Sequence, residues 1–256
     1  MDFCEVREKY PKFIYNDYKI TEEEDKIVIE YHFEIENLTK FNPRIEILKK
    51  NFKFNKINSN EVKNIVFNLG MVEAISYFKS TCSPQFFIKC GKLDAFQESW
   101  FKKLYYLGLG EFRFINNIKI EQNKLVEFIS IGEEIEVKQN DDKFSGCVIP
   151  VGGGKDSNVT MDLLKNYKND SLVFMIGGKK VSKECAKVAG YTDEQIIEVK
   201  RIIDKNLLNL NKQGFFNGHT PFSAIVAFIS YLCSYMLGKK YIALSNEDSA
   251  NETNVD

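Results

Sequence analysis

The chain has 256 residues, of which 44% are hydrophobic and 28% are charged, and its formal net charge at pH 7 is −1. That length and composition are typical of a globular protein that can bury a sizeable core, as one large domain or two smaller ones. A net charge so close to zero excludes the strong basic field that attracts nucleic acid from a distance, so we expect no nucleic-acid partner.

The six cysteines are scattered without a CxxC pair, and the chain has only two histidines that could join them in a metal site. A zinc cluster is therefore not expected. The start of the chain lacks the apolar segment of a signal peptide. The longest apolar stretch, residues 222–237, contains serines and is shorter than the roughly 20 residues that cross a bilayer. We expect a cytoplasmic protein with reduced thiols and no membrane span.

Residues 1–144 predict an α+β domain. Residues 26–37 alternate apolar and polar side chains, as a half-buried strand does, and residues 43–50 can pair with them across a turn at Asn42-Pro43. The other elements expected in this domain are a helix at 71–78, a short strand at 85–90, a helix at 93–110 that begins near Asp94, and strand-like segments within 115–138.

From about residue 145 the sequence changes to short apolar strands that alternate with helices. Such alternation predicts a doubly wound, mostly parallel sheet, so we expect residues 145–256 to form a second, α/β domain. Ligands of such sheets bind at the carboxyl ends of the strands. The expected strands are 147–151, 171–176, 195–203 and 240–245, and the expected helices are 156–167, 182–189, 205–214 and 221–237, the last with Thr220 as N-cap and Pro221 at its first position.

The segment VGGGKDS, residues 151–157, follows the first of these strands and precedes a helix. Glycines in this position let backbone N–H groups approach an anion closely, and the helix N-terminus adds partial positive charge, so phosphate is the expected ligand. The P-loop pattern is excluded because Ile149 stands where it needs glycine and Asp156 where it needs Ser or Thr. The dinucleotide pattern GxGxxG is excluded because its third glycine is Ser157 here.

The residues GGGKDS closely resemble the SGGxDS signature of the PP-loop ATP pyrophosphatases, with Gly152 where that family usually has serine. The resemblance implies an adenine nucleotide α-hydrolase-like sheet and cleavage of ATP between its α and β phosphates. It also implies that Lys155 neutralises charge that develops during the reaction. The pyrophosphate would be held by Gly152, Gly153, Gly154, Asp156 and Ser157.

Four further segments narrow the resemblance: GMVEAISYFKSTCSP from Gly70, LYYLGLGEF from Leu104, NGHTPFSAI from Asn217 and LSNEDSANETNV from Leu244. Together they resemble the UDP-N-acetylmuramoyl-L-alanyl-L-glutamate epimerase family, most densely after Pro150. The resemblance implies ATP and Mg²⁺ as cofactors and a UDP-MurNAc dipeptide as substrate. Adenylation of the terminal carboxylate would make the α-proton acidic enough to remove, so that L-Glu is inverted to D-Glu in peptidoglycan synthesis.

Other polar residues are candidates for the same site. His219, before the last predicted helix, would contact phosphate or act as acid or base, although it suits a structural helix-entry position equally well. Cys82 is a candidate for the acid/base pair because thiols serve in cofactor-free racemases, although free cysteines are more often buried and inert. Glu247 and Asp248 would hold Mg²⁺ or form part of a solvated loop. Nucleotide contacts are further expected from Gly177, Gly178, Asn217, Gly218 and Asn246.

Two alternatives stay open from the sequence. Members of the epimerase family continue well past the NETNV segment, so this chain is either a fragment or is completed by a C-terminal half on another chain. It would then be a non-catalytic nucleotide-binding fragment. The second alternative is another PP-loop ATP pyrophosphatase, such as a ligase, an amidotransferase or a tRNA-modifying enzyme. The lack of paired cysteines and of a basic excess disfavours a tRNA thiolase.

Overall fold

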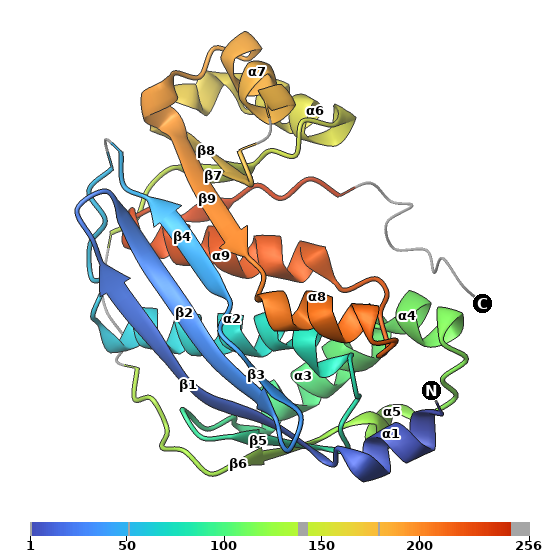
Figure 1. Cartoon of the computed structure of the whole chain (residues 1–256). Helices are drawn as coiled ribbons and strands as arrows, with labels where there is room; N and C mark the ends of the chain where they lie inside the picture. The colour runs from blue at the N-terminus through green and yellow to red at the C-terminus, as the bar shows by residue number, and fades with distance from the viewer. Residues whose placement is uncertain (1, 51, 138–142, 179, 247–256) are drawn as a thin grey trace.

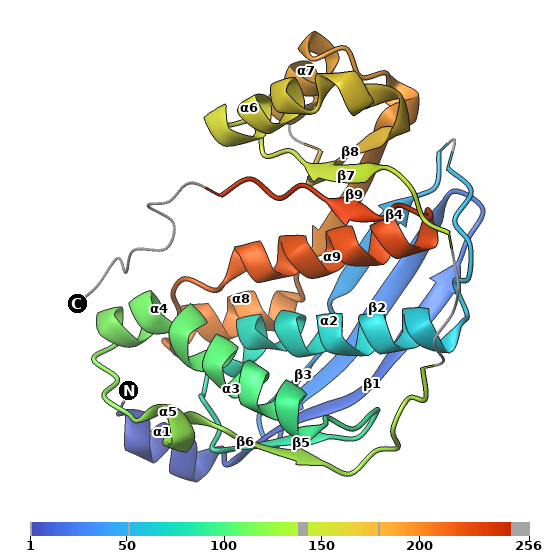
Figure 2. The same cartoon turned by 180° about the vertical axis from the view of Figure 1, so that it is seen from behind.

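The computed structural model describes residues 2–50, 52–137, 143–178 and 180–246 (Figure 1). Over these residues ten strands form one mixed sheet, and helices cover parts of both of its faces (Figures 1 and 2). The protein therefore has the α/β character that the sequence predicts.

Helices and strands occur in both halves of the chain, in the following order. The first half contains α1 (Phe3–Lys9), β1 (Lys12–Glu22), β2 (Lys26–Ile35), β3 (Thr39–Phe41), β4 (Arg44–Leu48), α2 (Asn60–Phe78), β5 (Gln85–Ile88), α3 (Ala95–Gly108), α4 (Gly110–Ile115), α5 (Gln122–Leu125) and β6 (Glu127–Ser130). The second half contains β7 (Cys147–Pro150), α6 (Lys155–Leu163), β8 (Ser171–Ile176), α7 (Lys180–Val188), β9 (Ile196–Ile202), α8 (Lys205–Lys212), α9 (Phe222–Met236) and β10 (Tyr241–Ile242).

The antiparallel hairpin of β1 and β2 is the framework of the first half. β4 pairs antiparallel with the edge of β2 away from β1, and β5 and β6 follow beyond β1 in parallel. These pairings confirm the strands predicted at 26–37, 43–50 and 85–90. Because β3 also pairs with β2, Asn42-Pro43 joins β3 to β4 and is not the turn of a β2–β4 hairpin.

Two predictions for the first half are wrong in extent. Helix α2 begins at Asn60, well before residue 71, with Ser59 Oγ accepting a hydrogen bond from the Val62 N–H. It is buried along most of its surface, so its sequence lacks the polar face that reveals a helix by periodicity. In the described part of 115–138, helix α5 and the single strand β6 replace the expected strand-like alternation.

The helix predicted at 93–110 is confirmed as α3. Asp94 is its N-cap and accepts a hydrogen bond from the Gln97 N–H, while the Gln97 side chain accepts one from the Asp94 N–H. This reciprocal capping box satisfies two backbone donors at the helix start. Gly110 begins the next helix, α4, instead of ending α3.

The strands and helices predicted for the second half are all present, with some ends changed. Helix α6 stops at Leu163, and a 3₁₀ helix follows at Lys165–Asp170. Helix α9 begins at Phe222, and its N-cap is Pro221, whose ψ of 76° lies outside the helical region. The prediction of Thr220 as N-cap is therefore wrong by one residue.

Strands β10, β7, β8 and β9 lie side by side in that order and run parallel. Helices α6 and α7 cover one face of these strands and α9 covers the other, while α8 follows β9 and packs against β3 (Figures 1 and 2). From β7 the chain adds β8 and β9 on one side, and it then crosses back to add β10 on the other side of β7. The strand order therefore reverses between β7 and β10, and such sheets bind ligands at this point. Since β9 pairs antiparallel with β4, one sheet continues across the predicted boundary at 144/145, and the division into two domains stays a prediction.

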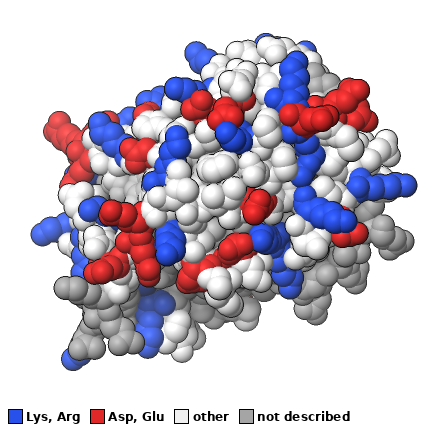
Figure 3. Space-filling view, turned by 90° about the horizontal axis from the view of Figure 1, so that it is seen from below, with Lys and Arg blue, Asp and Glu red and all other residues white. Residues whose placement is uncertain are grey.

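Two hydrophobic clusters hold the layers together. The larger one lies between the sheet and α2, α3 and α9, and the smaller one lies beneath α6 and α7. On the surface seen in Figure 3, basic and acidic side chains are interspersed, in keeping with the near-zero net charge. No helix in the described part of the chain is long and apolar enough to cross a bilayer.

Candidate functional site

A pocket of ≈ 350 Å³ lies at the carboxyl ends of β7 and β8. The glycine loop forms part of its wall, together with the first turn of α6 and the segment after β10. Because β7 and β10 flank the point where strand order reverses, the glycine loop lies at the edge of the sheet where ligands are expected.

The three glycines of the loop differ in what the fold requires of them. Gly153 has a φ of +85°, and a Cβ there would lie 3.0 Å from Val181 Cγ1, so its backbone favours glycine. Gly152 and Gly154 do not have positive φ, and a Cβ on either one would meet no atom within 4 Å. Both line the pocket. The fold therefore does not require glycine at either position, and the absence of side chains there leaves the backbone open to a ligand.

The N-terminus of α6 faces the same pocket. Gly154 is the N-cap, and no side chain caps the first turn. The N–H groups of a first helical turn have no partner within the helix, and they carry the partial positive charge of its dipole. Ser157 is buried, and its Oγ donates to the Gly154 carbonyl at 3.0 Å, which closes the loop onto the helix. This arrangement suits a phosphate group.

Asp156 is the one acidic side chain among the described residues that line the pocket. Its Oδ1 lies 2.9 Å from Lys155 Nζ, and both side chains are substantially exposed. A carboxylate would repel a phosphate in this pocket unless a cation lay between them. Mg²⁺ suits that position because it binds through one or two carboxylates together with substrate phosphates.

Another part of the pocket wall is apolar. It is formed by the end of β8 at Phe174–Ile176, by Phe222 and Val226 of α9, and by Leu244. Gly177 and Gly178 follow β8 with positive φ and open space around them. The Gly177 N–H already donates to the Val199 carbonyl at 2.8 Å, so a nucleobase would have to use other groups there.

The predicted residues Asn217, Gly218 and His219 lie on the loop between α8 and α9, just before the pocket residue Phe222. His219 is exposed. None of the three lines the pocket itself. The structure thus brings this loop next to the start of a pocket-lining helix without placing His219 in the pocket wall.

Cys82 lies in the loop after α2 and is fully buried. Burial raises the pKa of its thiol to about 12, although the nearby charges of Arg7, Arg113 and Lys79 act to lower it. It is not among the residues of the pocket wall. At neutral pH this environment favours the thiol over the thiolate, so the structure lends the predicted acid/base role no support.

The segment after β10 is attached to α6. Ser245 Oγ lies 2.8 Å from Thr160 Oγ1 of that helix, and the next residue, Asn246, is exposed. The predicted metal ligands Glu247 and Asp248 lie outside the described residues. Over the residues that are described, no group of three or more His, Cys, Asp or Glu side chains is arranged to hold a metal ion.

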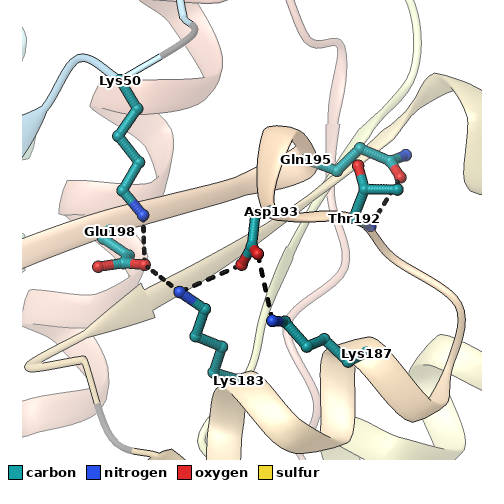
Figure 4. Close-up of polar contacts among 7 residues, drawn as sticks. All are labelled: Lys50, Lys183, Lys187, Thr192, Asp193, Gln195 and Glu198. Carbon is teal, nitrogen blue, oxygen red and sulfur yellow. Dashed lines mark hydrogen bonds and ion pairs between the residues drawn. The ribbon is translucent and has the colours of Figure 1, made fainter.

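A network of charged side chains fixes α7 to the sheet (Figure 4). Lys183 of α7 lies 3.5 Å from Glu198 of β9 and 3.1 Å from Asp193, and Lys187 also lies 3.1 Å from Asp193. Lys50, which follows β4, lies 2.5 Å from Glu198. Glu198 therefore joins the first half of the sheet to a helix whose first turn borders the pocket.

Glu198→Gln is expected to lower the free energy of unfolding by about 1–2 kcal/mol, because a neutral amide replaces a charged acceptor. Partial burial acts to raise the pKa of Glu198, but hydrogen bonds and charges from Lys50 and Lys183 lower it overall. This stabilisation is therefore present at neutral pH and is lost as pH falls through the acid range. Urea unfolding at pH 7 and pH 3 measures it, and an equal deficit at both pH values would contradict the assignment.

The matched control is Glu184→Gln, which disrupts an exposed pair with Lys180 on the same helix. It should change the free energy of unfolding by less than about 0.5 kcal/mol.

Several pocket residues were not predicted from the sequence. Ser182, Phe222 and Val226 were expected only as helix positions, yet they line the pocket. A usable signal existed for Ser182, because a helix that follows a parallel strand begins at the ligand-binding edge of the sheet. Phe222 and Val226 gave no such signal, since their contribution depends on how α9 crosses the sheet.

The fold and the pocket define an α/β protein with an open glycine loop where strand order reverses. The family profile described as the MurL N-terminal domain matches residues 4–256, and the chain belongs to this family. This confirms the family resemblance seen in the sequence. No solved structure matches the chain.

Three curated relatives are named UDP-N-acetyl-alpha-D-muramoyl-L-alanyl-L-glutamate epimerase. The protein from Xanthomonas oryzae pv. oryzae is 28% identical over 200 residues, which are 78% of this chain and 43% of the relative. The proteins from Salinispora tropica and Micromonospora sp. are 28% and 26% identical over 187 residues, which are 73% of this chain and 40% and 41% of the relatives. The match thus spans less than half the length of these curated relatives.

Proposed function

We propose that this chain is the ATP-binding part of a UDP-MurNAc-L-Ala-L-Glu epimerase that acts in peptidoglycan precursor synthesis. The observation that carries the proposal is the pair Gly152 and Gly154, which line the pocket although neither the backbone nor any neighbour requires glycine there. Membership of the MurL N-terminal domain family and the names of the curated relatives support the choice of reaction.

The chemistry explains why an epimerase of this kind would use ATP. Removing the α-proton of a carboxylate would give an enolate with two negative charges. Attack of the carboxylate oxygen on the α-phosphorus instead releases pyrophosphate and forms an acyl adenylate. Deprotonation then gives a singly charged, stabilised enolate, protonation on the opposite face inverts the centre, and water releases AMP and the D-glutamyl product. An acid and a base near pH 7 are required for the proton transfers.

In this proposal the residues of the pocket hold the triphosphate. The open backbone at Gly152–Gly154 and the first turn of α6 bind the phosphates, and Lys155 offsets their charge. Mg²⁺ would be held between Asp156 and the phosphates and would supply charge neutralisation during pyrophosphate release. The apolar wall from β8 and α9 would accept the nucleobase.

The reaction is tested by incubating the chain with α-labelled ATP, Mg²⁺ and UDP-MurNAc-L-Ala-L-Glu. Substrate-dependent label in AMP together with D-glutamate in the product supports the proposal. ATP binding without AMP supports a non-catalytic nucleotide-binding part, which the partial coverage of the relatives makes a specific alternative. Failure of ATP to bind at all contradicts both readings of the pocket.

Gly154→Val is expected to weaken ATP binding at least tenfold, because the new side chain would occupy the space where phosphate approaches the backbone. The loss of the glycine N-cap should cost no more than about 1 kcal/mol in the free energy of unfolding. Isothermal titration with ATP·Mg²⁺ and urea unfolding measure the two effects separately.

Gly152→Ser is the matched control in the same loop. Serine is usual at this position in the SGGxDS signature, so ATP affinity should stay within about twofold, and the protein should be no less stable because the backbone there suits any residue. Equal losses of ATP affinity in both variants would argue against a phosphate cradle centred on Gly154.

A further inference from the structure

Three segments that resemble the epimerase family, far apart in the sequence, meet at one place in the fold. Residues 70–84 end α2 and enter the next loop, residues 104–112 join α3 to α4, and residues 217–225 lead into α9. A Cβ on Gly108 would lie 2.7 Å from Pro221 Cγ, and one on Gly218 would lie 3.2 Å from Phe112 Cδ2. The loop at 217–221 is therefore seated in a close-fitting site made by the other two segments.

Lys79 is the polar centre of this junction. It is only 6% exposed, and its Nζ donates to Asn217 Oδ1 at 3.1 Å and to the Gly218 carbonyl. Asn116 Nδ2 donates to the Asn217 carbonyl at 3.0 Å from the side of α4. These bonds hold both sides of the turn that immediately precedes His219.

The fold gains little from the charge of this lysine. Burial, and after it the charge of Arg201 on β9, lower the pKa of Lys79 to about 8, while Cys82 acts in the opposite direction. Glu73 of α2 is bound to Arg201, and no carboxylate forms an ion pair with Lys79 among the described residues. Below pH 8 Lys79 is charged in both the folded and the unfolded state, and its charge is less favourable in the folded protein than in the unfolded chain. Perturbed groups of this kind cluster at functional sites.

The loop held by Lys79 leads directly to the glycine-loop pocket. Phe222 and Val226, at the start of α9, form part of the pocket wall. His219 precedes Phe222 by three residues, so its Cα lies within about 11 Å of that of Phe222. Any shift of the Asn217–Gly218 turn would therefore move both His219 and the wall of the pocket.

We propose that Lys79 is a positioning residue of the candidate active site: its side chain fixes the Asn217–Gly218 turn and thereby sets where His219 and the start of α9 lie beside the pocket. The effect on ATP rests on the proposed function, whereas the effect on His219 does not. Lys79 acts through the loop and is not assigned a contact with the substrate.

The test uses the two histidines of the chain, His32 and His219, as nuclear magnetic resonance probes. The imidazole C–H signals are followed from pH 5.5 to 9.5 in the unliganded protein and assigned with His32→Gln. The His219 signal should show an inflection near pH 8, because Lys79, which donates to the carbonyl of the adjacent residue Gly218, loses its proton there. His32 lies on β2 and should show no such inflection.

Lys79→Met should abolish the inflection near pH 8 and weaken ATP·Mg²⁺ binding about tenfold. Lys89→Met is the matched control, because Lys89 Nζ also donates to an asparagine Oδ1, that of Asn16, but far along the chain from the loop. It should change neither quantity. Asn217→Ala, at an exposed position, provides a second variant that retains the buried lysine and should shift the His219 signal and weaken ATP binding in the same direction.

The outcomes separate the two proposals. If wild-type protein does not bind ATP but the His219 inflection is present and is lost in Lys79→Met, the positioning role stands and the proposed function fails. If Lys79→Met or Asn217→Ala folds and leaves both the His219 signal and ATP affinity unchanged, the positioning role is overturned.

Discussion

Replacing Asp156 by asparagine is expected to reduce Mg²⁺-dependent AMP formation at least about a hundredfold while ATP still binds. Asp156 is the acidic side chain that the described pocket wall contains, and it stands in the first turn of α6, where phosphate is expected. A carboxylate next to a phosphate is unfavourable unless a cation neutralises both. The asparagine variant removes that repulsion and, with it, the reason for Mg²⁺ to bind there.

The two effects give the variant a distinctive signature in binding. Without Mg²⁺, ATP should bind Asp156→Asn as tightly as, or more tightly than, the wild-type protein. With Mg²⁺, the wild-type protein should gain affinity and the variant should gain much less. Titration calorimetry with and without Mg²⁺ measures this even if the chain alone forms no AMP.

Asp162→Asn is the control for a general effect of charge on α6. Asp162 is 73% exposed in the side chain and is paired with Lys165, and it does not line the pocket. Its removal should leave the Mg²⁺ dependence of ATP binding unchanged. An Asp156→Asn protein with the full Mg²⁺ dependence of the wild type would show that the metal binds elsewhere, and the predicted Glu247 and Asp248 would then be the first residues to test.

Most strands were predictable because each one is a short apolar or alternating run, but β1 was not among the predicted elements. The segment that forms β9 also suits a helix by its sequence pattern, and only its β-branched residues favour the strand. Helix α2 was only half predicted, since a helix surrounded by the core has no polar face to reveal its period. The junction of β9 with β4 was not predictable at all, because antiparallel pairing between distant strands leaves no local signal in either one.

Some features of the candidate site could likewise be predicted from the sequence, and others could not. The glycine loop was predictable because small residues between a strand and a helix have a local physical meaning. The difference between Gly153, which the backbone requires, and Gly154, which it does not, appears only in three dimensions. Lys79 was overlooked because nothing near it in sequence indicates that its Nζ meets Asn217, and Cys82, three residues later, drew attention to its chemistry instead of to its burial.

Arg201→Met is expected to lower the free energy of unfolding by about 3–5 kcal/mol at pH 7. Arg201 of β9 binds Glu73 of α2 through two nitrogens, at 2.7 and 3.0 Å, and also donates to Ser76 Oγ at 2.7 Å. Glu73 is completely buried. Removing the guanidinium would leave a buried carboxylate without a counter-charge, and that uncompensated charge is the main cause of the loss.

A double variant distinguishes this cause from lost packing. The double variant Glu73→Met/Arg201→Met contains no unpaired charge and should recover most of the deficit. Lys165→Met, which breaks an exposed pair, should cost less than about 0.5 kcal/mol.

Urea unfolding of the four proteins, followed by circular dichroism and by the fluorescence of the single tryptophan, Trp100, completes the test. Trp100 reports on α3 in the first half, whereas circular dichroism reports on the whole chain. Because the Glu73–Arg201 pair joins α2 to β9, a single cooperative core predicts that both signals shift together in Arg201→Met. A tryptophan transition that keeps its wild-type midpoint while the circular dichroism transition splits would instead show that residues 1–144 fold independently and that the pair is a contact between two domains.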